Sequence, residues 1–147
     1  MLTNNGKFFF GTTQTLAPGS SIGLKAFGGA TREYSKNNYA AHQKIMIGNS
    51  NTEPASSDYF MDGRITALTE ISSSSRAPAQ FEEAFMQACT TTYINNTDQP
   101  VTVNELGYAM CDDTSFSDDF AVLIARELID PLVIQPGETF AFTMVLG

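Results

Sequence analysis

The side chains that could carry out catalysis are few in this chain and lie far apart in the sequence. His42 is the single histidine, and it directly precedes an apolar run. As a general base it would need a nucleophile and an orienting carboxylate, and the sequence offers Cys89 or the many serines as partners. Spacings such as Gly-x-Ser-x-Gly, His-Glu-x-x-His, Cys-x-x-Cys and a glycine-rich phosphate loop are absent. We therefore predict a structural, hydrogen-bonded His42, no catalytic residues, no cofactor and no enzymatic activity.

The densest group of charges is acidic. Asp112-Asp113 and Asp118-Asp119 place four carboxylates within eight residues, and Ca²⁺ prefers several hard oxygen ligands on a flexible loop. The spacing lacks the Asp-x-Asp-x-Asp-Gly order and the closing Glu of the known calcium-binding loop, so we expect a solvated hairpin tip without metal. Glu82 and Glu83 are adjacent, and adjacent strand residues point to opposite faces, so we expect no glycosidase pair there.

Length and composition limit the kind of fold that can hold these residues and the partners that it can have. The chain has 147 residues, of which 42% are hydrophobic, and this is enough for the core of one globular domain. Eight basic against sixteen acidic residues give a net charge of −8, which repels phosphate and argues against a nucleic-acid partner. No apolar stretch approaches the length of a signal segment or a membrane span. We expect a soluble protein made in the cytosol, with Cys89 and Cys111 as free, buried thiols.

Short runs of alternating or apolar residues indicate strands. Only 16% of the residues are charged, so the surface must rely on Ser, Thr, Asn and Gly, which favour strands and turns. We expect strands at Lys44–Gly48, Arg64–Ile71, Phe81–Ile94, Val101–Asn104, Phe120–Ala125 and Thr139–Leu146. The strand at 120–125 is apolar on both faces, as in a central strand, and Arg126-Glu127 is expected to end it. The serine tract Ser72–Ser75 is expected to be a flexible connection.

The segment Asn95–Pro100 has the composition of a turn between two strands. Counting outward from it, a hairpin would pair Ile94 with Val101 and Cys89 with Leu106. We therefore predict that the strands on either side of this turn are neighbours in one sheet.

The alternation of the strand after this turn changes phase near Glu105. Before the change, the apolar residues of one face are the odd-numbered Val101 and Val103. After it, the apolar residues are the even-numbered Leu106, Tyr108 and Met110. One extra residue in a strand produces such a change, so we predict a β-bulge there.

The last turn and strand have the most specific pattern. Gln135-Pro136-Gly137-Glu138 has Pro and Gly at the two central positions, as a type II turn requires. After it, the residues on one face are Phe140, Phe142, Met144 and Leu146. We expect this strand to bury its aromatic and aliphatic face in the core.

At least six short strands separated by turns predict an all-β fold, an antiparallel β-sandwich or jelly roll. Residues 1–40, which are rich in Gly and Pro, are expected to form an irregular N-terminal arm, and residues 41–147 the sandwich domain. Phe8, Phe9 and Phe10 form a compact apolar group in this arm. They either fill the end of the core or dock on a neighbouring subunit as an assembly interface.

Several segments, taken in order, resemble a group of small bacteriophage virion proteins that are capsid decoration or tail-associated proteins. These segments are Met1–Gly6, Ile45–Pro54 with Asp58-Tyr59, Leu68–Ile71 with Arg76, Val103–Tyr108, Leu123–Arg126 and Pro136–Phe140. In the family an apolar run ends in Gly-x-Gly before a Pro and an Asp, and here Asn49-Ser50 stands in place of the second glycine region. The resemblance covers nearly the whole chain from about residue 44, with a looser N-terminus.

The resemblance implies a non-enzymatic, repeated building block of a phage particle. We expect first a capsid decoration (cement) protein that is trimeric or otherwise a symmetric homo-oligomer. It would bind over the joints between major capsid subunits and stabilise the head. A tail, neck or fibre-associated structural protein is the alternative, and a glycan-binding module is a further one, against which the chain has no Trp. The expected partners are further copies and the major capsid protein or other virion proteins, without nucleic acid or membrane. The expected location is the virion, after synthesis in the host bacterial cytoplasm.

Overall fold

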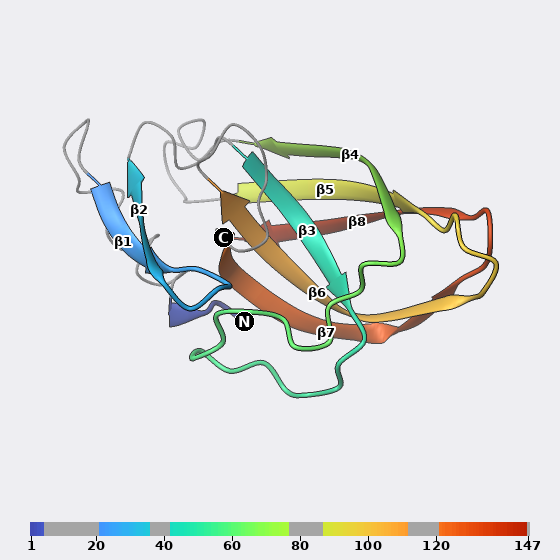
Figure 1. Ribbon diagram of the computed structural model, residues 1–147, viewed down its shortest axis with the longest axis horizontal. Helices are drawn as coiled ribbons and strands as arrows, with labels where there is room; N and C mark the ends of the chain where they lie inside the picture. Colours follow the sequence, from blue (N-terminus) through green and yellow to red (C-terminus); the bar gives the residue numbers. More distant parts are fainter. Residues whose placement is uncertain (5–20, 36–41, 77–86, 112–120, 147) are drawn as a thin grey trace.

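The computed structural model describes residues 1–4, 21–35, 42–76, 87–111 and 121–146, and every named element in these ranges is a β-strand (Figure 1). The strands are β1 (Ser21–Lys25), β2 (Thr31–Ser35), β3 (His42–Gly48), β4 (Thr69–Arg76), β5 (Gln87–Ile94), β6 (Val101–Cys111), β7 (Val122–Ile134) and β8 (Thr139–Leu146). All their pairings are antiparallel. This confirms the predicted all-β, antiparallel fold. In the described ranges no helix has the length and apolar character needed to cross a membrane.

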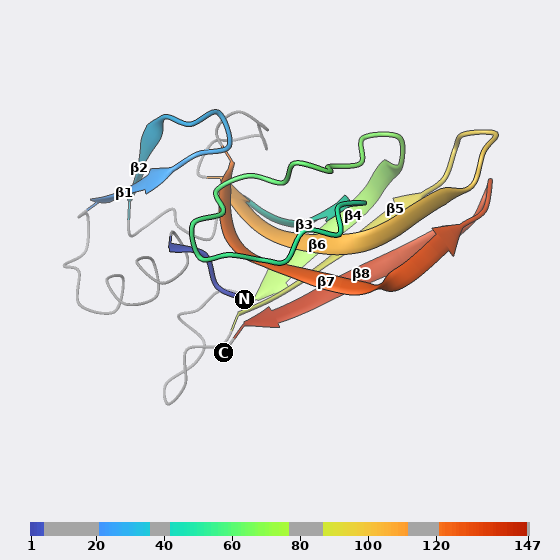
Figure 2. The same ribbon diagram turned by 90° about the horizontal axis from the view of Figure 1, so that it is seen from below.

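Two three-stranded sheets form the body of the molecule, with the orders β3-β6-β7 and β4-β5-β8. In Figure 1, β4, β5 and β8 run together across the molecule while β3, β6 and β7 cross them obliquely. The core lies between the sheets and takes residues from both, such as Ile45 and Tyr108 from the first and Tyr93 and Phe142 from the second. The β1–β2 hairpin is set apart from both sheets (Figure 2). It lies within residues 1–40, and the division of the chain at residue 40 stays a prediction.

The predicted hairpin between β5 and β6 is wrong, because the two strands belong to different sheets. Ile94 pairs with Thr69 and Thr139 rather than with Val101. The reason is Asn95, which is fully buried and whose amide nitrogen donates to the Ile134 carbonyl at 2.9 Å. Its backbone is also bonded on both sides to the turn between β7 and β8. The chain therefore crosses to the other sheet at Asn95 instead of turning back on itself.

The strand predicted at Arg64–Ile71 begins and ends later, as β4 over Thr69–Arg76, and the serine tract predicted to be a flexible connection lies inside it. The Ser73 hydroxyl donates to the Gln43 carbonyl at 3.0 Å and contacts the Thr91 hydroxyl at 2.9 Å. Short hydroxyl side chains thus replace apolar ones where β4 meets the other sheet. The predicted start of the next strand, at Phe81, lies outside the described residues.

The strand at 120–125 was predicted to be a central strand and to end at Arg126-Glu127, and both predictions are wrong. β7 is an edge strand that continues to Ile134. The strand continues through Arg126 because Glu105 and Asp58 neutralise the charge of this side chain. The edge of β7 is covered locally by residues 1–3, where Leu2 pairs with Ala125 in an antiparallel bridge. This cover explains why that part of an edge strand is as apolar as a central one.

The predicted bulge near Glu105 is confirmed, since the β6–β7 register shifts between Val103 and Glu105. As a result, Val103 joins Leu106 and Tyr108 in the core between the sheets. All residues of β6 from Val103 onward are buried, because the sheet β3-β6-β7 is covered on both faces. Its inner face meets the core, and its outer face carries a second apolar cluster of Met46, Met61, Ala109, Ala121 and Leu123, with Phe27 against it.

The connection between β3 and β4 runs beside the sheet β3-β6-β7 (Figure 2) and contributes Met61 to this outer cluster. Met61 in this connection is 4% exposed and packs against Gly107 of β6. A Cβ at Gly107 would overlap with the Met61 sulfur, so this glycine is what allows the connection to approach the sheet. A backbone bond from Ile65 to the Ile47 carbonyl, 2.8 Å, closes the far end of the connection on β3.

The last turn is confirmed: Gly137 has φ of 82°, as the third residue of a type II turn requires. In β8, Phe142 and Met144 are buried as predicted, whereas Phe140 at the start of the strand is 42% exposed. Its ring still contacts that of Phe142, with 4.9 Å between the centroids. Cys89 and Cys111 are free and buried.

Candidate functional site

Most residues singled out in the sequence lie outside the described part of the chain. These are Phe8, Phe9 and Phe10, Glu82 and Glu83, and the acidic segment Asp112–Asp119. His42 begins β3, where its backbone lies opposite Cys111. Among the residues that the structure describes, no group of three or more His, Cys, Asp or Glu side chains is placed to hold a metal ion.

A buried ionic cluster, which the sequence analysis did not find, lies on the outer face of the sheet β3-β6-β7. The Arg126 guanidinium donates to Glu105 Oε2 from Nε at 2.7 Å and lies 2.7 Å from it through Nη2. Its Nη1 donates to Asp58 Oδ2 at 2.9 Å, and its Nη2 to the Thr52 carbonyl at 2.7 Å. The side chains of Arg126, Glu105 and Asp58 are 5%, 0% and 25% exposed. We call this group the ionic clasp.

The backbone explains why the clasp forms at this position. The bulge after Val103 turns Glu105 toward the outer face, and Arg126 pairs with Gly107, two residues further along β6. Gly48 lies opposite Glu105 on β3, and a Cβ there would overlap with the Glu105 carboxylate. Two features of the sheet, the bulge and Gly48, therefore open the space that the Glu105 carboxylate occupies beside Arg126.

The clasp joins three separate parts of the chain. Asp58 and Thr52 belong to the connection between β3 and β4, and Asp58 also accepts from the Ala55 amide at 2.9 Å. On the other side, the Met1 ammonium group donates to the Arg126 carbonyl at 2.9 Å, and the Arg126 amide donates to the Met1 carbonyl at 3.0 Å. The cluster thus fastens the first residues and residues 49–66 to the sheet.

The charge state of the clasp is fixed by its neighbours. Burial is the largest effect on the pKa of Arg126 and lowers it, but the hydrogen bonds and charges of Glu105 and Asp58 outweigh it and raise the pKa above its ordinary value. A cation with a raised pKa keeps its stabilising contribution until the pH passes that pKa. The guanidinium therefore stays charged at neutral pH and can pair with Glu105 and Asp58 as a structural cation.

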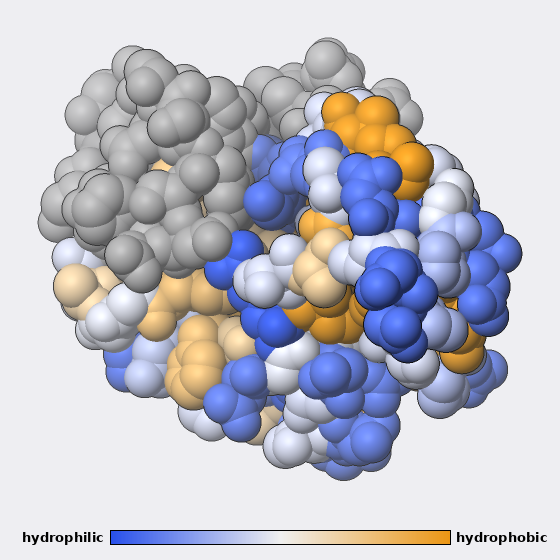
Figure 3. All heavy atoms as spheres, turned by 45° about the vertical axis from the view of Figure 1, so that its right-hand side comes forward, coloured by the Kyte–Doolittle hydropathy of each residue, from blue (hydrophilic) through white to orange (hydrophobic). Residues whose placement is uncertain are grey.

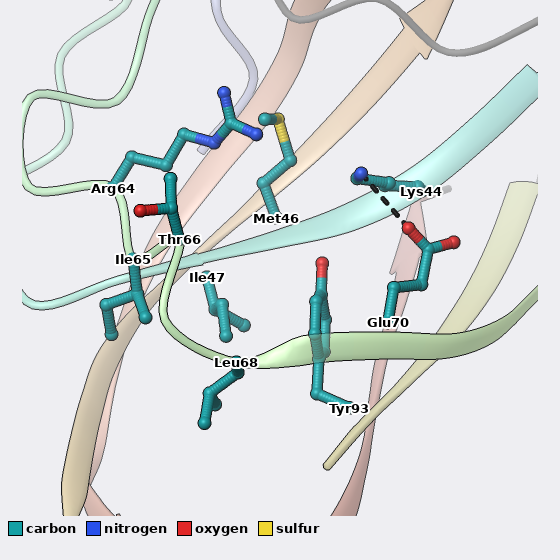
Figure 4. A pocket seen from close by; sticks show the side chains of 9 residues that line it. All are labelled: Lys44, Met46, Ile47, Arg64, Ile65, Thr66, Leu68, Glu70 and Tyr93. Carbon is teal, nitrogen blue, oxygen red and sulfur yellow. Dashed lines mark ion pairs between the residues drawn. The ribbon is translucent and has the colours of Figure 1, made fainter. Parts of the chain in front are cut away.

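A second candidate site is a cavity of about 280 Å³ beside β3 (Figure 4). Lys44 and Glu70 form an ion pair of 3.1 Å on one side of it, and Arg64 and Thr66 come from the segment before β4. Its floor is apolar, with Ile47 and Leu68. The Tyr93 hydroxyl points toward this space in Figure 4 but already donates to the Ile45 carbonyl at 2.6 Å.

The edge of β3 beside this cavity is closed by side chains of the opposite sheet. The Ile45 amide donates to the Thr91 hydroxyl at 2.8 Å, and the Ile45 carbonyl accepts from Tyr93. The Gln43 carbonyl accepts from Ser73. These bonds occupy the groups through which an edge strand would pair with another chain, so β3 does not offer a template for strand addition.

The outer face of the sheet β4-β5-β8 has a different chemistry. We call it the hydroxyl face, and its outward residues are Thr69, Ser72, Ser74, Ala88, Thr90, Thr92, Ile94, Thr139, Ala141, Thr143 and Val145. The alternate residues Cys89, Thr91 and Phe142 are buried, which fixes the outward orientation of this set. None of these outward side chains is charged, and the Thr90 and Thr143 hydroxyls are 2.7 Å apart across the strands.

The exposed apolar residues of the described ranges lie on several elements, and one of them, Val145, belongs to the hydroxyl face. The large ones are Met1, Phe60, Ile71, Val133, Phe140 and Val145. The view in Figure 3 shows apolar surface as separate patches between hydrophilic residues.

Comparisons of the chain with protein families, with curated proteins and with solved structures find no match.

Proposed function

We propose that the chain is a non-enzymatic structural protein of a bacteriophage particle, and that it decorates the capsid as a cement protein that stabilises the head. The ionic clasp is the observation that carries this proposal. The buried Arg126 and Glu105 and the half-buried Asp58 contact one another and hold residues 49–66 in place. The ion pairs of the clasp thus maintain a surface shape, which is what a protein acting by contact area requires.

The fastened connection presents an aromatic corner that suits a protein partner. Tyr59 and Phe60 directly follow Asp58 of the clasp, and their ring centroids lie 4.8 Å apart. Phe60 is 40% exposed, and the Lys25 ammonium lies 3.7 Å from the centre of the Tyr59 ring. Aromatic side chains on a rigid support lose little entropy on binding and often dominate interface energy. We assign this corner to the contact with the major capsid protein.

Quantitative mass spectrometry of purified particles tests the proposal. The expected result is hundreds of copies per particle, in a fixed ratio to the major capsid protein. About a dozen copies per particle would instead favour the tail, neck or fibre-associated role. Absence of the protein from the particle would overturn both structural roles.

A binding experiment tests the aromatic corner. Particles lacking the protein are mixed with the purified chain, and co-sedimentation and thermal release of DNA are measured. The Phe60→Ala variant should bind at least about tenfold more weakly, whereas Val133→Ala, which changes an apolar residue of similar exposure on β7, should bind like the original. Equal binding of both variants would show that the aromatic corner is not part of the interface with the capsid.

The cavity beside β3 favours a second candidate function, a glycan-binding module. Lys44 and Glu70 could donate to and accept from sugar hydroxyls above the apolar floor. A glycan array with the purified chain, repeated with Glu70→Gln, tests it. Selective binding that weakens in the variant would support this function, and an array without signal would exclude it.

A further inference from the structure

The hydroxyl face is the one broad sheet face that the described residues leave uncovered. The outer face of the sheet β3-β6-β7 is covered by residues of the same chain, among them Met61 and Phe27. On the hydroxyl face, Thr143 and Val145 of the edge strand are exposed, and Val145 is 59% exposed. The face therefore has room for a flat partner.

The distribution of charge identifies which partner fits this face. The chain carries a net charge of −8, so two copies that meet through average surface repel each other. The described outward side chains of the hydroxyl face carry no charge, and Arg76 occupies a register position at its margin, opposite Ala88. A basic protein would find no carboxylates among these described side chains, and the register offers a nucleic acid only one basic position, Arg76 at the margin. A second copy of the same face meets no like-charge repulsion between the described outward side chains, because none of them is charged.

The residue types of the face are self-complementary. A Thr or Ser hydroxyl is both a donor and an acceptor, so a ladder of hydroxyls can bond to an identical ladder related by a two-fold axis. The Thr methyl groups, Ala141 and Val145 supply apolar area between them. Packed sheets lie face to face about 10 Å apart, and small side chains allow at least this close an approach.

The size of the face sets the expected affinity. Each of its three strands has eight residues, and strand spacings of about 4.8 Å and about 3.3 Å per residue give a plane of about 14 Å by 26 Å. Two copies would bury about 700 Å² in total, which is below the size of standard specific interfaces and belongs to weak, transient contacts. The association it supports is therefore weak and depends on protein concentration.

We propose that the outer face of β4-β5-β8 is a self-association surface, on which a second copy of this chain packs sheet against sheet. This inference does not depend on the proposed role in a phage particle. It concerns the isolated protein in solution, so that its failure and that of the capsid proposal can be told apart.

Sedimentation velocity of the full chain at about 10–500 µM tests the inference. The original chain should shift from monomer to dimer over this range. Thr143→Glu places a carboxylate at an exposed position of the face and should raise the dimer dissociation constant at least about tenfold. Val133→Glu adds the same charge at an exposed position of β7 and should leave the dimer unchanged.

Circular dichroism and thermal melting of both variants verify that they are folded. A second variant, Thr90→Glu, tests the neighbouring position on β5, whose hydroxyl contacts that of Thr143. An original chain that stays monomeric over the whole range would overturn the inference. So would a dimer that survives both Thr143→Glu and Thr90→Glu, because it would have to use another surface.

Discussion

The two sheets of this protein use opposite means to complete their outer faces. The sheet β3-β6-β7 covers its outer face with its own chain, by the apolar cluster around Met61 and by the ionic clasp of Arg126. The sheet β4-β5-β8 leaves a plane of short hydroxyl side chains such as Thr90 and Thr143. A buried charged pair tolerates little change, because removing one partner leaves the other desolvated. The comparison therefore predicts that substitutions are costly on the first sheet and cheap on the second.

The largest effect is expected for Arg126→Met. This variant leaves the fully buried Glu105 carboxylate without its cation and should lower the free energy of unfolding by about 3–5 kcal/mol. Urea denaturation measures the change. The double variant Arg126→Met, Glu105→Gln should recover part of the loss. A decrease below about 1 kcal/mol in the single variant would show that the clasp is solvated and weak.

The clasp was not predicted from the sequence, although two of its three residues leave a signal there. Glu105 interrupts the run Val103–Tyr108, and Arg126 follows the apolar run Leu123–Ala125. Two opposite charges, each joined to buried strand residues, are a usable signal of a buried pair. Arg126 was instead predicted to end a strand. Asp58 lies in an irregular connection and gave no periodic signal, so its place depends on the folded sheet.

The fold itself was predictable where the determining interactions are local. The φ of Gly137 and the phase change at Glu105 follow from neighbouring residues, and both were predicted. The partner of β5 was not, because the length of the segment after Ile94 suits a hairpin equally well. The choice is made by the buried Asn95 amide, which bonds to Ile134 across the molecule, and no local pattern contains that contact.

A second, smaller effect is expected at the close approach between the first sheet and its cover. Gly107→Ala places a methyl group against the Met61 sulfur and the Leu123 side chain. The overlap should cost about 1–3 kcal/mol of unfolding free energy, measured by the same denaturation. Met61→Ala should lower the unfolding free energy less in the Gly107→Ala variant than in the original protein. If the two changes were simply additive, the contact between them would not be the cause.

A third effect lies at the inner face of the second sheet and depends on pH. Burial, the largest cause, raises the pKa of the Cys89 thiol. Above about pH 9 the unfolded chain loses this proton while the folded chain keeps it, so the folded state becomes less stable as the pH rises. The slope should reach up to about 1.4 kcal/mol per pH unit.

Chemical denaturation at a series of pH values, with the original chain and Cys89→Ser, measures this slope. Groups that titrate identically in both proteins cancel in the difference between them. The variant should be less stable at neutral pH and lose less stability above pH 9. Parallel curves for the two proteins would mean that the Cys89 thiolate forms equally well in the folded chain.

The smallest effect is expected on the hydroxyl face. Thr143→Val replaces an exposed hydroxyl, bonded only at the surface to Thr90, by a methyl group of nearly the same shape. A surface substitution of this kind changes the unfolding free energy of the monomer by less than about 0.5 kcal/mol, and the β-branched side chain still suits the strand. Denaturation at low protein concentration measures the monomer alone. A loss of unfolding free energy comparable to that of Gly107→Ala would mean that the hydroxyl contacts stabilise the second sheet. The two sheets would then differ in the chemistry of their outer faces but not in their tolerance of substitution.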